Sequence, residues 1–85
     1  MPGKYTPLEQ YLRDIPSSQR DVTLSFEQVE VILKFHLPAS AYEDERWWRH
    51  EKEGNHVNAR AWANAGWQVA EVHFNPTWVR FVRVQ

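Results

Sequence analysis

The sequence predicts a small α+β domain, with helices first and a β-hairpin at the C-terminal end. Eighty-five residues are enough for one domain and no more. Apolar residues recur at helical spacing in the N-terminal half, whereas residues 67–84 alternate in the manner of two strands around a turn. We therefore expect residues 1–85 to form a single domain of three to four helices followed by a hairpin, with a short strand before the second helix.

The composition is that of a folded protein without cysteine. Hydrophobic residues make up 42% of the chain and charged residues 25%, the balance of a globular domain rather than a disordered one. The absence of cysteine excludes disulfides, thiolate metal sites and a cysteine nucleophile, and it favours the cytoplasm. No apolar run approaches the roughly 18 residues of a membrane helix, so we expect no membrane segment.

The first helix is expected over residues 7–15. Thr6 is placed as its N-cap, Pro7 as the first helical residue and Glu9 as the third. Apolar side chains then recur at i, i+3, i+4 and i+7 and so share one helical face, which consists of Leu8, Tyr11, Leu12 and Ile15. Pro16 ends the helix, because the residue before a proline disfavours the helical conformation.

A short strand and a second helix follow. Residues 22–24 form a β-prone run. Ser25 is expected to cap the next helix, because Gln28 three residues later completes a capping box. The helix is expected over residues 26–34 and ends before Pro38. Its apolar face consists of Phe26, Val29, Ile32 and Leu33.

Two further helices are expected before the hairpin. Ser40 and Glu43 have the spacing of another capping box and predict a helix over residues 41–50. Alanine recurs at every second position from residue 59, which makes residues 56–65 a good helix former. Gly66 is placed where that helix should stop.

The remainder of the chain predicts the hairpin around residues 75–77. Pairing Phe74 with Val79 puts four apolar side chains on one face, namely Val72, Phe74, Val79 and Phe81. The opposite face then carries Glu71, His73, Arg80 and Val82. Trp67 and Val69 have the other parity, so a bulge near Ala70 is needed if both apolar sets are buried.

Four of the five tryptophans lie in residues 47–67, among arginine and amide side chains. Such a segment can be the core of a small domain, or a surface that binds an aromatic or anionic partner. We expect core rings at Trp48, Trp62 and Trp67. Adjacent residues on a helix point about 100° apart, so Trp47 is expected at the surface when Trp48 is buried.

The order of elements is that of a winged-helix domain, in which the helix before the hairpin is the usual DNA-reading element. Residues 1–45 hold four Lys and Arg against eight Asp and Glu, a net charge of −4, and residues 46–85 hold six against three, a net charge of +3. The positive half permits an anionic partner. We therefore expect nucleic-acid binding, with DNA as the partner and contacts at Arg49, Lys52, Arg60, Asn64 and Arg80.

A protein-interaction module or a homodimer is the competing interpretation, because fold does not determine function. An exposed Trp47 near Tyr42 would form a plausible interaction hot spot, since tryptophan and tyrosine are enriched in such spots. The sequence leaves both interpretations open.

Neither metal binding nor catalysis is expected. The histidines have no cysteine beside them and no His-Glu-x-x-His pattern, although His50 and His56 straddle a loop; the other two are His36 and His73. The carboxylates cluster where a solvated face explains them, and no glycine-rich phosphate loop is present. We expect no catalytic residue, no cofactor and no metal site.

Two stretches of the chain form a distinctive pattern. The first is Leu37-Pro38-Ala39-Ser40-Ala41, and the second is the series Trp47-Trp48, His56, Ala61-Trp62 and Ala65-Gly66-Trp67. This pattern resembles a group of small bacterial domains of unknown function. The resemblance also includes Tyr5-Thr6-Pro7-Leu8, Leu24-Ser25-Phe26 and Val79-Arg80-Phe81-Val82-Arg83, so it covers nearly the whole chain. It implies no particular activity. The chain departs from the group at Arg49, where an amide such as Asn is expected, so a ligand contact at that position would differ.

Overall fold

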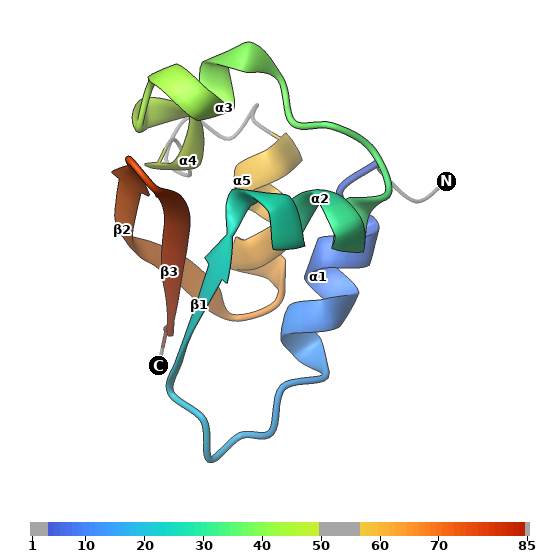
Figure 1. The fold of residues 1–85 in the computed structure, drawn as a ribbon. Helices are drawn as coiled ribbons and strands as arrows, with labels where there is room; N and C mark the ends of the chain where they lie inside the picture. The colour runs from blue at the N-terminus through green and yellow to red at the C-terminus, as the bar shows by residue number, and fades with distance from the viewer. Residues whose placement is uncertain (1–3, 50–56, 85) are drawn as a thin grey trace.

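The computed structural model describes residues 4–49 and 57–84, and within residues 57–60 it describes the backbone alone. These residues form a mixed α+β fold with five helices and a three-stranded antiparallel sheet (Figure 1). The helices are α1 Thr6–Arg13, α2 Phe26–Leu33, α3 Ala39–Glu43, α4 Arg46–Arg49 and α5 Val57–Asn64. The strands are β1 Asp21–Ser25, β2 Trp67–Phe74 and β3 Thr77–Arg83.

The sheet has the order β1-β3-β2, so the last strand of the chain lies in the middle. Val69 pairs with Phe81 and Glu71 pairs with Arg80, which leaves Ala70 as the extra residue of a bulge. The bulge near Ala70 is thus confirmed. The bulge turns both apolar sets of β2, Trp67 with Val69 and Val72 with Phe74, to the same inner face of the sheet. The helices cover this face in Figure 1.

The predicted hairpin register is wrong by two residues. Phe74 pairs with Thr77, and Val79 pairs with Val72 instead of Phe74. Only Asn75 and Pro76 remain between the strands, so the turn is shorter than predicted. Because a slip of two residues preserves the side of every residue, the predicted faces of the hairpin are correct.

The capping box at the start of α2 is confirmed. Ser25 Oγ accepts a hydrogen bond from the Gln28 amide at 3.0 Å, and Gln28 Oε1 accepts one from the Ser25 amide at 2.8 Å. The other two predicted caps are wrong. Helix α1 begins at Thr6, with Tyr5 as an N-cap that makes no side-chain bond. Helix α3 begins at Ala39, one residue before Ser40. Its N-cap is Pro38, whose carbonyl accepts a hydrogen bond from the Ala41 amide.

The single helix predicted over residues 41–50 is two short helices. Asp44 between them is extended, with φ −138° and ψ 112°. Its Oδ1 accepts a hydrogen bond from the Arg46 amide at 2.9 Å, so the aspartate side chain caps α4 and competes with a continuous helix. Helix α5 has the predicted position, and Gly66 ends it with φ +87°, a conformation that glycine adopts without strain.

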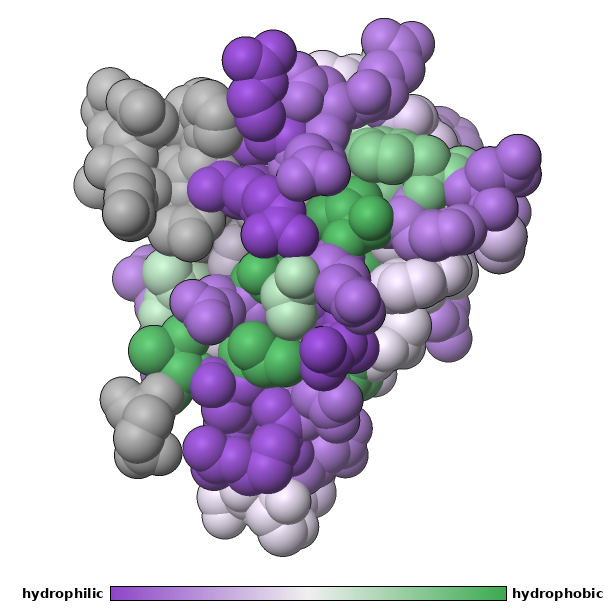
Figure 2. All heavy atoms as spheres, turned by 90° about the vertical axis from the view of Figure 1, so that its left-hand side faces the viewer, coloured by the Kyte–Doolittle hydropathy of each residue, from purple (hydrophilic) through white to green (hydrophobic). Residues whose placement is uncertain are grey.

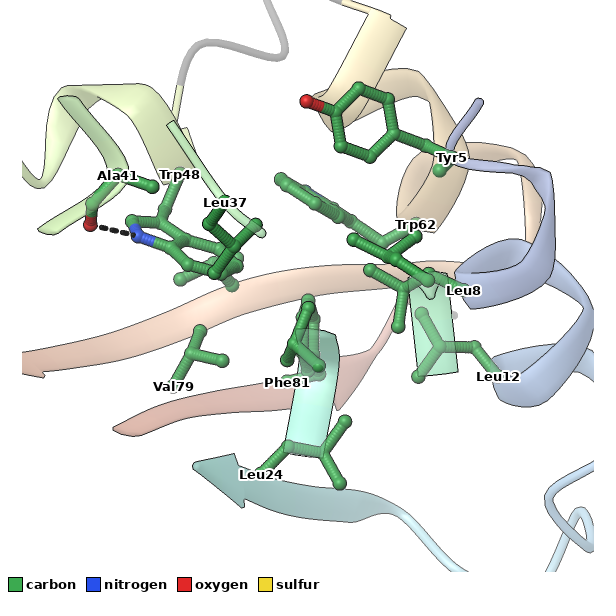
Figure 3. Close-up of a cluster of buried hydrophobic side chains, with 14 of the residues drawn as sticks. Tyr5, Leu8, Leu12, Leu24, Leu37, Ala41, Trp48, Trp62, Val79 and Phe81 are labelled. Carbon is green, nitrogen blue, oxygen red and sulfur yellow. Dashed lines mark hydrogen bonds between the residues drawn. The ribbon is translucent and has the colours of Figure 1, made fainter. Parts of the chain in front are cut away.

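The core lies between the sheet and the helices and contains three fully buried indoles, of which Figure 3 labels those of Trp48 and Trp62. Trp48 and Trp62 stack with their centroids 5.7 Å apart and 23° between their planes. The Trp48 Nε1–H donates to the Ala41 carbonyl at 3.0 Å, and the Trp67 Nε1–H donates to the Leu12 carbonyl at 3.1 Å. The core positions predicted for Trp48, Trp62 and Trp67 are confirmed.

A partly buried carboxylate joins α2 to the segment that leads into α3. Glu30 Oε2 accepts hydrogen bonds from the Leu37 amide at 2.8 Å and from the Tyr42 hydroxyl at 2.9 Å, and His36 Nδ1 lies 3.6 Å from Oε1. Burial raises the pKa of Glu30, but these three groups outweigh it and leave the pKa below its ordinary value. Burial and the bond to Glu30 raise the pKa of Tyr42 to about 12.

We predict that Ser25→Ala lowers the free energy of unfolding by about 1 kcal/mol, because the Gln28 amide loses the Ser25 hydroxyl as its hydrogen-bond acceptor. Ser40→Ala is the matched control, since Ser40 makes no capping bond, and its effect should be a few tenths of a kcal/mol at most. Urea unfolding measures both. Equal losses from the two substitutions would contradict the capping assignment.

We predict that Tyr42→Phe lowers stability at pH 7 by about 1–2 kcal/mol, because Glu30 loses a hydrogen-bond donor. The unfolded chain releases the tyrosine proton near pH 10 and the folded chain near pH 12. The stabilisation by the hydroxyl is therefore complete below pH 10 and disappears as the pH rises towards 12.

Urea unfolding of both proteins at neutral and alkaline pH tests this linkage. The difference in stability between the wild type and Tyr42→Phe should shrink between pH 10 and pH 12. A difference that is constant across this interval would show that the hydroxyl does not bind Glu30.

Candidate nucleic-acid interface

Three of the five predicted nucleic-acid contacts have described side chains, namely Arg49, Asn64 and Arg80. Lys52 lies outside the described residues. Arg60 lies in the first half of α5, residues 57–60, where the backbone alone is described. Because Asn64 follows Arg60 by four residues in that helix, the two positions share a helical face.

Arg80 lies on the outer face of the sheet, at the centre of its middle strand. Its Nη1 lies 3.1 Å from Asp21 Oδ2 on β1, and its Nε lies 3.2 Å from Glu71 Oε1 on β2. The bond to Glu71 and the charges of both carboxylates raise the pKa of Arg80. The three side chains together carry a net charge of −1. A phosphate group at this position would have to compete with two carboxylates for one guanidinium.

Arg49 is the last residue of α4, and its guanidinium bridges two structural elements. Its Nη2 donates to the Ala70 carbonyl at 2.9 Å, and its Nε lies 3.3 Å from Glu45 Oε2. Ala70 is the bulge residue of β2, so Arg49 binds the strand at the point where its pairing with β3 is irregular. Arg49 and Arg80 thus contact consecutive residues of β2: Arg49 binds Ala70, and Arg80 binds Glu71.

Asn64 is the exposed last residue of α5. Its carbonyl accepts a hydrogen bond from Arg13 Nη2 at 3.0 Å, and the same guanidinium pairs with Glu9 at 3.0 Å. Arg13 at the end of α1 is thus a cation of this face that the sequence analysis missed. Its place in the last turn of a helix was visible in the sequence, whereas its contact with a residue 51 positions later was not.

The two predicted interaction residues are partly buried, and their rings pack against the core. The Tyr42 ring meets Phe26 edge to face at 5.1 Å, and its hydroxyl is bound to Glu30. Trp47 is half-buried, with its ring centroid 6.0 Å from that of Tyr5 and 4.8 Å from that of Trp48. The predicted surface ring therefore forms the rim of the core. A role of Tyr42 and Trp47 in binding a protein stays a prediction.

The fifth tryptophan, which the sequence analysis left unassigned, lies beside the hairpin turn. Trp78 stacks on His73 of the neighbouring strand, with the ring centroids 5.0 Å apart and the planes 5° from parallel. His73 Nδ1 lies 2.7 Å from the Pro76 carbonyl, which can only accept, so this nitrogen carries the proton. The stack lies on the outer face of the sheet, two residues along β3 from Arg80.

The side of the molecule formed by α3, α4 and the hairpin is largely hydrophilic, with apolar side chains in patches between the polar ones (Figure 2). Among the described residues, no group of three or more histidine, aspartate or glutamate side chains could hold a metal ion. None of the described helices has the length and apolar character needed to span a bilayer.

Comparison with known proteins identifies a family but no function. The model of one family, described as a domain of unknown function (DUF7662), matches residues 5–84. No curated protein and no solved structure matches the chain. The resemblance to small domains of unknown function agrees with this match. Since the match covers all but the two ends, the chain belongs to the DUF7662 family.

Proposed function

We propose that this chain is a winged-helix domain that binds double-stranded DNA in the cytoplasm and catalyses no reaction. The observation that carries the proposal is topological. Helix α5 comes directly before the β2–β3 hairpin, and the early strand β1 joins the same sheet by pairing with β3. A helix followed by a two-stranded wing is an arrangement in which the helix enters the major groove and the hairpin lies beside it.

The exposure of α5 supports this role. Ala61 and Trp62 are buried against the rest of the domain, whereas Ala63 and Asn64 at the end of the helix are exposed. Arg60 shares a helical face with Asn64, and Lys52 precedes the helix. An amide that can bind base edges and a cation that can bind phosphate therefore occur on one face of the helix.

The charge pairs on the hairpin predict that this binding is weak. Arg80 forms ion pairs with Asp21 and Glu71, and Arg49 forms one with Glu45, so both of these predicted phosphate ligands are already paired within the protein. Lys52 and Arg60 are the cations that we expect to bind phosphate. We expect affinity in the range of non-specific DNA binding, with a strong dependence on salt.

We predict that Lys52→Gln/Arg60→Gln weakens binding of a labelled duplex by at least about tenfold at about 50 mM salt, because two phosphate contacts are lost. The slope of log affinity against log salt should fall by about two units. Fluorescence anisotropy measures both quantities. Lys4→Gln/Arg20→Gln is the control, with the same change in net charge in other parts of the chain.

The proposal fails if the wild type, at about 100 µM and about 50 mM salt, leaves the anisotropy of the duplex unchanged. It also fails if the two double variants lose affinity equally, because binding would then follow net charge rather than the helix α5 face.

We predict that Asp21→Asn/Glu71→Gln strengthens duplex binding severalfold at low salt, because the substitutions free Arg80 on the wing and remove two negative charges. Asp14→Asn/Glu43→Gln is the matched control, since both of its carboxylates are exposed on other elements. A gain that is no larger than that of the control would show that the hairpin does not contact DNA.

A further inference from the structure

The exposed face of α2 carries the most exposed of the large hydrophobic side chains among the described residues. Val31 is 76% exposed. Hollows of about 370 Å³ and about 400 Å³ flank it, and both are lined by Val31 and Glu27. The first hollow also includes Tyr11 and Ile32, and the second includes Phe35. An apolar knob between two hollows is a shape that can interdigitate with another knob of the same kind.

The charges on this face have a specific order. Glu27 precedes Val31 by four residues and Lys34 follows it by three, and all three line the second hollow. Neither the Glu27 carboxylate nor the Lys34 ammonium forms an ion pair or hydrogen bond with another described side chain. By contrast, the neighbouring Glu30 already accepts hydrogen bonds from the Leu37 amide and the Tyr42 hydroxyl.

This order is self-complementary for an antiparallel pair of helices. A two-fold axis that passes between the two Val31 side chains places Glu27 of one copy opposite Lys34 of the other, and the symmetry repeats the pair on the other side. Glu27 lies in the first turn of α2 and Lys34 directly follows its last residue, so the two charges lie at opposite ends of the helix and both pairs can form at once. The face thus offers opposite charges at the places where its own copy requires them.

We propose that the protein forms a symmetric dimer through this face of α2, with Val31 of each copy entering the hollows of the other. The commitment to a second copy, rather than a foreign partner, rests on the charge order. The face is small, so the dimer falls among weak and transient interfaces, with dissociation in the micromolar range or above. The inference does not depend on DNA binding, because it uses neither α5 nor the hairpin.

Sedimentation equilibrium of charge-reversed variants tests the dimer. The wild type should associate between about 10 µM and about 1 mM. Glu27→Lys alone puts like charges opposite each other in both pairs, as does Lys34→Glu alone, so each variant should associate at least about tenfold more weakly. A mixture of the two variants should form a heterodimer, because every pair in it is again of opposite sign. The double variant Glu27→Lys/Lys34→Glu should self-associate like the wild type.

Glu43→Lys is the control, since it makes the same charge change as Glu27→Lys at an exposed position on α3 and should leave the association unchanged. Val31→Asp should abolish association in every background, and near-ultraviolet circular dichroism checks that each variant is folded. A wild type that stays monomeric at about 1 mM would overturn the proposal. So would a dimer that Val31→Asp leaves intact, or single variants that fail to associate with each other when mixed.

Discussion

The indole N–H groups of two buried tryptophans need acceptors, and this need connects the parts of the fold. The Trp48 indole binds the Ala41 carbonyl seven residues earlier, which requires the chain to turn between α3 and α4. The Trp67 indole binds the Leu12 carbonyl and so fixes the first residue of β2 to α1. Each ring buries roughly 150–250 Å² of surface. An indole N–H without an acceptor would cancel part of the free energy that this burial contributes. The Trp62 indole, which stacks on that of Trp48, has no hydrogen-bond acceptor among the described residues.

Patterns with a short range in sequence predict most of this fold correctly. The spacing of Ser25 and Gln28 predicts the start of α2, and the parity of Trp67 and Val72 predicts the bulge of β2, because both depend on neighbouring residues. The same spacing at Ser40 fails. There, a proline already supplies the N-cap conformation and an aspartate side chain captures the next amide, so the predicted helix divides in two.

The chemistry of the candidate interface was far less predictable, because its partners are distant in sequence. Arg80 is a plausible phosphate ligand when the sequence is considered alone. In the fold, β1 pairs with β3 and brings Asp21 to within 3.1 Å of a guanidinium 59 residues away. Arg49 likewise reaches the Ala70 carbonyl only because α4 packs against β2. Strand pairing therefore decides which cations remain available to a partner.

DNA and a second copy of the chain are proposed to bind different faces of the molecule, DNA at α5 and the hairpin and the second copy at α2. Two-dimensional amide NMR of the labelled protein tests it most directly. On addition of duplex at low protein concentration, the resonances of residues 57–64 and of the β2–β3 hairpin should shift while those around Val31 stay in place. Raising the protein concentration without DNA should shift only the resonances around Val31. Shifts of one shared set of residues in both titrations, or of neither face, would contradict the account.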